Sequence, residues 1–221
     1  MSLAIFDIDG TIVDSNAVDN QCFLETFARE FGIDAAGTDW SGYSHHTDRG
    51  LAHEFLRRAW SRDPEEVDIV RHQSAFMRLL RERANVLHEI AGAKKFIQLL
   101  RRARWTVALA TGAWSESAAL KLGLAGFPAD LPLVCCDTYA SREDIVRHAI
   151  GSQQPSNIVV FGDGWWDVRT ARNLGLPFIG VASGSAAEGL RRAGATEVIL
   201  DFSDAEMVLA AMQRARPPEL D

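Results

Sequence analysis

The apolar residues of the chain fall into two kinds of pattern. Six short apolar runs have the length and composition of strands that are buried on both faces of a parallel sheet. Helical segments separate most of these runs, which predicts an α/β fold with a doubly wound, parallel-sheet (Rossmann-like) core. The predicted strands are residues 3–6, 106–110, 133–136, 158–161, 178–181 and 197–200.

Residues 16–83 show only helical patterns. Apolar side chains recur at helical spacing over residues 18–31, and Gly32 behind them is a typical C-terminal stop. A second helix is predicted over 51–60, and a third begins after Asp63, which we expect to be its N-cap. We therefore predict two domains, a catalytic core of residues 1–15 and 88–221 and an inserted all-helical cap of residues 16–87.

Composition narrows the classes of function. The chain of 221 residues has a formal net charge of -7 and no long basic run, which argues against a nucleic-acid partner. No segment reaches transmembrane length, and the chain starts with a predicted strand, so we expect a cytoplasmic protein with no membrane partner. Its three cysteines lack metal-binding spacing, which predicts reduced thiols. The sequence does not indicate whether the protein is a monomer or an oligomer.

Two aspartates follow the first predicted strand. The side chains of Asp7 and Asp9 start on the same side of the strand, and Gly10 allows the backbone to turn sharply behind them. Open α/β sheets bind their ligands at this carboxyl end of the strands. Buried like charges need a cation or a reaction, so the pair predicts a functional site. The alternative is a strand followed by an Asp-Gly turn with solvated acids.

Two later strands carry polar residues at the same end. Thr111 and Gly112 follow the strand over 106–110, and Asp163 and Asp167 follow the strand over 158–161. Separately, Thr111 could simply end a strand and Asp167 could cap a helix. Together with the first pair, however, four carboxylates at one end of a sheet would repel each other without a cation. This set of oxygen ligands predicts Mg²⁺ as the cofactor.

Three segments of the chain, DIDGTIVDS, ALATGAWS and VVFGDGWWDVRTARNLGL, resemble motifs of the haloacid dehalogenase-like hydrolase superfamily. The resemblance covers nearly the whole chain, is weak in the cap, and points to phosphatases with a helical cap, such as phosphoglycolate phosphatases. It implies Mg²⁺-dependent hydrolysis of a small phosphate monoester through an aspartyl-phosphate. The implied partner is a small phosphorylated metabolite.

The resemblance also implies roles for the motif residues. Asp7 would be the nucleophile, and Asp9 would be the general acid and then the general base. Thr111 and the amide of Gly112 would hold the oxygens of the transferring phosphoryl group. The implied Mg²⁺ ligands are Asp7, the backbone carbonyl of Asp9, Asp163 and Asp167.

Other members of the superfamily provide the alternatives. Asp9 favours phosphoryl transfer over dehalogenation, because dehalogenases lack this second aspartate. The chain has no lysine before Lys94, which excludes the phosphonate hydrolases that need a cap lysine. The motifs leave two alternatives open, a phosphosugar mutase and a catalytically weak regulatory member that binds a phosphorylated ligand.

The chain departs from the family in one cation. The family normally has a lysine at the start of the helix before the strand over 158–161, and this chain has Arg142 there. We expect Arg142 to neutralise the nucleophile and the phosphate, because arginine is a permanent cation suited to phosphate. The alternative is Lys121, which we expect to point to solvent.

Further substrate contacts are expected from Thr11 in the first motif and from two loop residues. Arg49 in the cap loop would grip a substrate carboxylate, and Trp114 would stack on a substrate ring. A solvated loop for Arg49 and a crevice cover for Trp114 are the alternatives. His45 and His46 are adjacent and lack the helical spacing of a metal-binding pair, so no zinc site is predicted.

Overall fold

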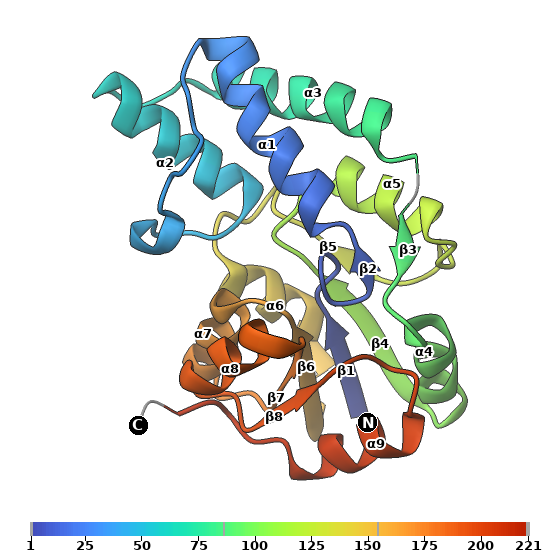
Figure 1. The fold of residues 1–221 in the computed structure, drawn as a ribbon. Helices are drawn as coiled ribbons and strands as arrows, with labels where there is room; N and C mark the ends of the chain where they lie inside the picture. Colours follow the sequence, from blue (N-terminus) through green and yellow to red (C-terminus); the bar gives the residue numbers. More distant parts are fainter. Residues whose placement is uncertain (1, 86, 154, 220–221) are drawn as a thin grey trace.

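The structure of the protein, a computed structural model, describes residues 2–85, 87–153 and 155–219 (Figure 1). Its six-stranded sheet is entirely parallel and has the order β5-β4-β1-β6-β7-β8. The predicted α/β class with a doubly wound parallel sheet is confirmed. The strands are β1 (Ser2–Phe6), β4 (Trp105–Ala110), β5 (Leu133–Val134), β6 (Asn157–Gly162), β7 (Phe178–Val181) and β8 (Glu197–Ile199).

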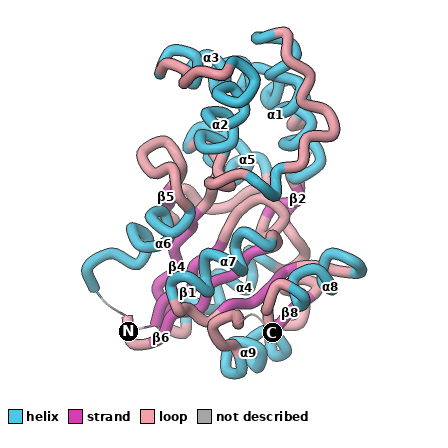
Figure 2. The backbone as a smooth tube through the Cα atoms, turned by 90° about the vertical axis from the view of Figure 1, so that its left-hand side faces the viewer, coloured by secondary structure: helices cyan, strands magenta, loops and turns pink. Residues whose placement is uncertain are grey.

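Helices cover both faces of this sheet. The helices outside residues 16–83 are α4 (Ala93–Arg102), α5 (Ser115–Leu124), α6 (Arg142–Ile150), the 3-10 turn η2 (Gly151–Gln153), α7 (Trp165–Leu174), α8 (Gly184–Arg192) and α9 (Ala205–Arg214). Figures 1 and 2 show α6, α7 and α8 on one face and α4 on the other. Phe96 of α4 packs on Phe161 and Phe202, and the ring centroids of Phe6 and Phe161 are 4.5 Å apart. This aromatic burial stabilises the pairing of β1 with β6, the two strands that carry the predicted acids.

Residues 16–83 form a layer of helices above the carboxyl ends of the strands (Figure 1). The layer contains α1 (Asn16–Phe31), the 3-10 turn η1 (Trp40–Gly42), α2 (Asp48–Trp60) and α3 (Glu66–Arg83). α1 ends at Gly32 in the left-handed conformation, with φ +67, as the pattern predicted. Phe23, Phe27, Phe55 and Phe76 are buried between these helices. The division of the chain into a core domain and a cap domain stays a prediction.

Two local features differ from the expectations. α3 begins at Glu66 rather than beside Asp63, because Glu65 and Asp68 cap it reciprocally and the Glu65 amide donates to Asp68 Oδ2 at 3.0 Å. A short antiparallel pair, β2 (Val13–Asp14) with β3 (His88–Glu89), was not predicted, because two-residue strands carry no periodicity. This pair places the two connections between the sheet and the helical layer side by side.

The structure tests the expectations for the cysteines and for membrane-spanning helices. Cys22, Cys135 and Cys136 are buried and unpaired, as predicted for reduced thiols. None of the helices in the described part of the chain combines the length and apolar character needed to cross a bilayer. The cytoplasmic location stays a prediction.

His72 in α3 makes the stability of the helical layer depend on pH. Its ring lies 4.8 Å from that of Phe23 and 4.3 Å from that of Phe27, between centroids. Burial lowers the pKa of His72 from 6.5 to about 3. Stability that depends on the neutral ring is therefore present above the unfolded pKa and is lost as the pH falls toward the folded one.

The substitution His72→Leu should remove this pH dependence. Between about pH 8 and about pH 5, the wild type should lose about 2 kcal/mol more of its free energy of unfolding than the variant, measured by urea unfolding. The exposed His88 provides a control, and His88→Gln should behave like the wild type. Equal losses in the wild type and His72→Leu would contradict this explanation.

Candidate active site

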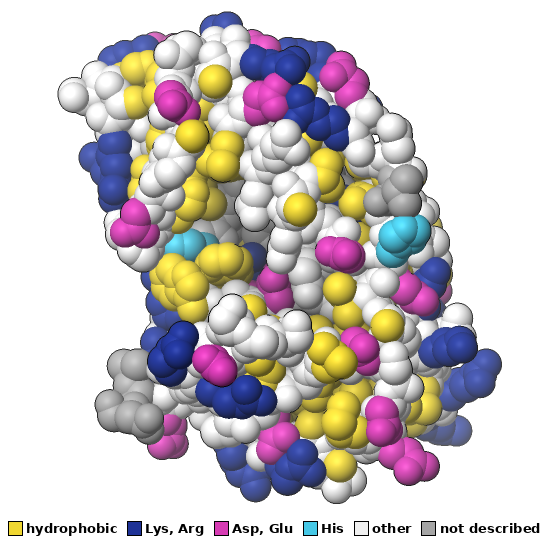
Figure 3. Space-filling view, viewed as in Figure 1, with side chains coloured by type: hydrophobic (Ala, Val, Ile, Leu, Met, Phe, Trp, Pro, Cys, Tyr) yellow, Lys and Arg dark blue, Asp and Glu magenta, His cyan; other side chains and the backbone are white. Residues whose placement is uncertain are grey.

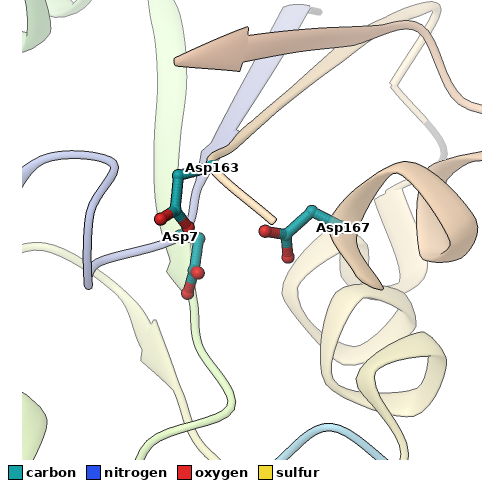
Figure 4. Close-up of side chains that lie close together, drawn as sticks. All are labelled: Asp7, Asp163 and Asp167. Carbon is teal, nitrogen blue, oxygen red and sulfur yellow. The ribbon is translucent and has the colours of Figure 1, made fainter. Parts of the chain in front are cut away.

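Three carboxylates meet where β1 and β6 end. Asp7 directly follows β1, Asp163 directly follows β6, and Asp167 lies in the first turn of α7. Because β1 and β6 are parallel neighbours, their carboxyl ends lie side by side. A carboxylate oxygen of each residue lies within 4.8 Å of those of the other two. Figure 4 shows Asp7 and Asp163 next to each other, with Asp167 facing them.

A glycine turn allows the first motif to approach this cluster closely. Gly10 has φ +69, and a Cβ at this position would lie 2.0 Å from Asp163 Oδ2. The Gly10 amide donates to the Val13 carbonyl at 2.8 Å, which closes the turn. Asn16, at the start of α1, donates from Nδ2 to Asp163 Oδ2 at 2.7 Å. Sequence reasoning missed Asn16, which follows the motif by only one residue.

Burial raises the pKa of all three carboxyls. For Asp7, the charge of Asp9 adds to the effect of burial and Arg142 opposes it. For Asp167, burial raises the pKa to about 7 against the opposing charge of Arg142. For Asp163, burial and the charges of Asp167 and Asp7 raise the pKa well above its usual value. The protein alone does not stabilise three negative charges here, so the cluster favours a bound cation.

Arg142 contacts the cluster from the start of α6, at the position that the motif predicted. Nη2 lies 3.5 Å from Asp7 Oδ2, and Nη1 donates to Asp167 Oδ1 at 2.5 Å. Nε donates to the backbone carbonyl of His46 at 2.8 Å, which links the guanidinium to the helical layer. Only 13% of the side chain is exposed. Arg142 is therefore a cation held in place beside Asp7.

Lys121 does not point to solvent, and that expectation is wrong. Its side chain is completely buried in α5, where Nζ lies 2.7 Å from Asp9 Oδ1 and forms an ion pair with Asp19 Oδ1. Burial lowers the pKa of Lys121, but the charges of Asp19 and Asp9 outweigh this and raise it above its usual value. The expectation failed because α5 lies beneath the helical layer, so its inner face meets α1 rather than water.

Asp9 is held by residues that differ from those around Asp7. Ser15 Oγ donates to Asp9 Oδ1 at 2.5 Å, and Lys121 pairs with the same oxygen. The side chain of Asp9 stays 17% exposed. The two aspartates of the motif thus lie in separate environments, with Arg142 beside Asp7 and Lys121 beside Asp9.

The start of α2, which belongs to the helical layer, contacts the loop after β4. The Asp48 amide donates to the Gly112 carbonyl at 2.8 Å, and the Trp114 amide donates to Asp48 Oδ2 at 3.1 Å. Thr47 Oγ1 donates to the Ala140 carbonyl at 2.9 Å. A Cβ on Gly112 would lie 2.9 Å from the His46 carbonyl, so glycine is needed for this close approach. These contacts of Asp48 and Thr47 were not predicted, because their partners are distant in sequence.

A cavity of about 360 Å³ lies between the strand ends and the helical layer. Asp9, Thr111, Gly112 and Arg142 line it on the strand side. The Thr111 hydroxyl is buried and accepts a hydrogen bond from the Ala113 amide at 3.2 Å. Figure 3 shows a hollow between the upper and lower parts of the molecule, with hydrophobic side chains on its border. The cavity is large enough for a small organic ligand.

Three predicted substrate contacts do not line this cavity. Arg49 is turned toward Glu66, with Nη1 donating to Oε1 at 3.0 Å and Nη2 donating to Oε2 at 2.6 Å. Trp114 is only 1% exposed, and Thr11 is completely buried. The stacking proposed for Trp114 therefore has no exposed ring face, while Trp166 from α7 lines the cavity instead.

Comparison with known proteins identifies the family. The family described as haloacid dehalogenase-like hydrolase matches residues 1–175. The chain belongs to this family. This haloacid dehalogenase-like hydrolase is 31% identical over 195 residues to the phosphoglycolate phosphatase of Agrobacterium fabrum (strain C58), covering 82% of this chain and 81% of that protein. Family and relative together make it a phosphoric monoester hydrolase.

Two solved structures share the fold of this haloacid dehalogenase-like hydrolase. A hydrolase from Pseudomonas syringae aligns with a TM-score of 0.74 and 23% identity, covering 95% of this chain and 98% of that one. CbbY from Rhodobacter sphaeroides, solved in complex with phosphate, aligns with a TM-score of 0.65 and 25% identity, covering 91% of this chain and 95% of that one.

Replacing Lys121 should strongly destabilise the protein. Lys121→Met leaves Asp9 and Asp19 close together without the buried cation, and breaking such a pair costs about 3–5 kcal/mol. Urea unfolding should show this loss in the free energy of unfolding. The exposed Lys95 is the matched control, and Lys95→Met should change the value by about 0.5 kcal/mol or less. An unchanged value in Lys121→Met would show that the ion pairs do not stabilise the fold.

Proposed function

We propose that this hydrolase cleaves small phosphate monoesters in a Mg²⁺-dependent reaction that proceeds through a phosphorylated Asp7. The observation that supports this most directly is the cluster of three carboxylates, two of them buried, with oxygens within 4.8 Å of one another, beside the guanidinium of Arg142. The relative's name makes phosphoglycolate one candidate in this class. The proposed partner is thus a small phosphorylated metabolite.

The ligand chemistry of the cluster fits Mg²⁺. Carboxylate oxygens are hard ligands, and Mg²⁺ binds through a few of them while keeping several waters. Asp7, Asp163 and Asp167 would hold the ion, together with the backbone carbonyl of Asp9. The bound ion would supply positive charge that neutralises the phosphoryl oxygens.

Asp7 and Asp9 divide the chemistry between them. An oxygen of Asp7 attacks phosphorus, and the bond from phosphorus to the leaving oxygen breaks while Asp9 donates a proton to that oxygen. Asp9, now a carboxylate, takes a proton from water as the water oxygen attacks phosphorus. This second step releases phosphate and restores Asp7. The contacts of Asp9 with Ser15 and Lys121 orient its carboxylate for both transfers.

The remaining residues position the phosphoryl group. The guanidinium of Arg142 pairs with the phosphoryl oxygens as Asp7 attacks. The Thr111 hydroxyl and the Gly112 amide, both at the end of β4, donate to the same group. The helical layer excludes water from the cavity during transfer.

A screen for phosphate release over small phosphate esters tests the proposed function. Release should require Mg²⁺ and should stop in excess chelator, whereas Ca²⁺ should inhibit because it takes more ligands in looser geometry. Isomerisation of a sugar phosphate without phosphate release would indicate the mutase alternative. Tight binding of phosphate esters without turnover would indicate a regulatory member.

Asp163→Asn should raise the Mg²⁺ concentration needed for half-maximal activity, by about 10-fold or more, because it removes one anionic ligand. Calorimetry should show the same loss in Mg²⁺ affinity independently of turnover. Glu206→Gln, an exposed acid in α9, is the control and should bind Mg²⁺ like the wild type. Unchanged Mg²⁺ affinity in Asp163→Asn would remove Asp163 from the metal site.

A further inference from the structure

We propose that the substrate's leaving group is uncharged and presents an apolar face to the helical layer. This inference deepens the proposed function and rests on it, and within the proposed class it argues against phosphoglycolate, whose leaving group carries a carboxylate. It concerns the side of the cavity that faces away from Asp7 and would hold the part of the substrate beyond the phosphate. Two observations carry it, the distribution of charge around the cavity and the apolar side chains of its wall.

The cavity contains acids but only one cation. Among the described residues that line it, Arg142 is the sole lysine or arginine. Its three nitrogens face Asp7, Asp167 and the His46 carbonyl, so its charge lies where the phosphoryl group would bind and not beside the leaving group. Asp19 and Asp48 line the opposite wall from α1 and α2. A carboxylate on the leaving group would meet these acids with no cation to pair with.

The nearby cations are paired with other groups and leave no free positive charge for the leaving group. Lys121 is completely buried between Asp9 and Asp19 and is not part of the cavity lining. Arg49 forms its two hydrogen bonds with Glu66. Arg169 lies 5.2 Å from the centroid of the Trp165 ring and donates to the Ser44 carbonyl.

The one histidine in the wall is also uncharged at neutral pH. Burial and the charges of Arg169 and Arg142 together lower the pKa of His46 to about 4, although a hydrogen bond to the Trp40 carbonyl raises it. His46 therefore offers no positive charge to a leaving group.

Apolar side chains complete the wall. Phe23 and Leu24 of α1, Trp40 of η1, Leu51 of α2 and Trp166 of α7 all line the cavity. Flat aromatic faces bind apolar or ring-shaped groups and gain little from a hydrated ionic group. In Figure 3, hydrophobic side chains border the hollow between the two layers. The wall thus matches an uncharged group with an apolar face.

Three esters with the same phenol leaving oxygen isolate the effect of charge. They are the phosphates of para-(hydroxyethyl)phenol, para-(carboxymethyl)phenol and para-(aminoethyl)phenol, in which methylene groups separate the remote group from the ring. Phosphate release with Mg²⁺ should give the hydroxyethyl ester a kcat/KM about 10- to 100-fold above that of the carboxymethyl ester. Equal or better turnover of the carboxymethyl ester would overturn the inference. A clear preference for the aminoethyl ester would also overturn it, in favour of a cationic leaving group.

A variant pair tests whether the wall causes the discrimination. Asn20 is exposed in α1 and lines the cavity. Asn20→Arg supplies the missing cation and should raise the relative kcat/KM of the carboxymethyl ester about 10-fold. Asn20→Gln, which adds length without charge, should leave the ratio at its wild-type value. A ratio that moves equally in both variants would show that charge in the wall does not set the preference.

Binding measurements distinguish a failure of this inference from a failure of the proposed function. If no ester releases phosphate, the proposed hydrolysis fails, but the corresponding benzylphosphonates still report on the cavity. Calorimetry should then give the hydroxyethyl compound a Kd about 10-fold below that of the carboxymethyl compound. Equal Kd values would overturn the inference whether or not the protein is active.

Discussion

Asp7→Asn should abolish turnover while the protein stays folded. Asparagine keeps the shape of the side chain but lacks the anionic oxygen that attacks phosphorus. The covalent route is then closed, and we expect kcat to fall by about 10⁴-fold or more, measured by phosphate release at saturating substrate. Turnover close to the wild-type value would contradict a nucleophilic Asp7.

Stability of the same variant separates lost chemistry from misfolding. Burial raises the pKa of Asp7 above 3.8, so the folded protein holds this proton more tightly than the unfolded chain. Folded-state stability therefore falls as the pH rises past the unfolded pKa, and at neutral pH the ionised carboxylate is destabilising in metal-free protein. Asp7→Asn removes this cost, so its Tm without metal should rise. Glu206→Gln, distant from the site, should change neither activity nor Tm.

Arg142→Ala should reduce kcat/KM by about 10²–10³-fold, the effect of removing a preorganised donor from a charged transition state. The loss should be large because Arg142 contacts both Asp7 and Asp167 and is the only lysine or arginine among the described residues that line the cavity. Arg142→Lys should recover part of the activity, since the positive charge remains although lysine lacks a planar guanidinium that can donate to two groups at once.

A control for Arg142 lies on the same helix. Arg147 in α6 is exposed and pairs with Asp144 at 2.9 Å, so Arg147→Ala should retain the kcat/KM of the wild type. Lys121→Met is no such control, because Lys121 contacts Asp9 and helps to orient its carboxylate. Wild-type kcat/KM in Arg142→Ala would remove Arg142 from the phosphate side of the site.

The sheet and its acids were predictable because both depend on short-range patterns. Buried strands of a parallel sheet have continuous apolar runs, and Asp7 and Asp163 directly follow two such runs. Parallel neighbours end at the same edge, so adjacency of these acids follows from the topology alone. Arg142 was predicted from the family resemblance instead, because it takes the place of the family's lysine at the helix start before β6.

The wall of the cavity was not predictable, because its contacts join distant segments. Lys121 was expected in solvent, since its position along α5 does not reveal that α1 covers that face. Arg49 was expected at the substrate, but its partner Glu66 lies in the next helix. Helical spacing identifies which residues share a face and not which face meets the site.

The direct test of the account is to trap the phosphorylated enzyme. Asp9→Asn should slow release of phosphate by about 10²–10⁴-fold, because the general base for water is lost. Mixing this variant with an activated ester and Mg²⁺, quenching in acid and analysing peptides by mass spectrometry should show one phosphoryl group on Asp7 that hydroxylamine removes. We expect that label in Asp9→Asn and none in the Asp7→Asn, Asp9→Asn double variant. Rapid turnover with an unlabelled Asp7, or label on another residue, would contradict it.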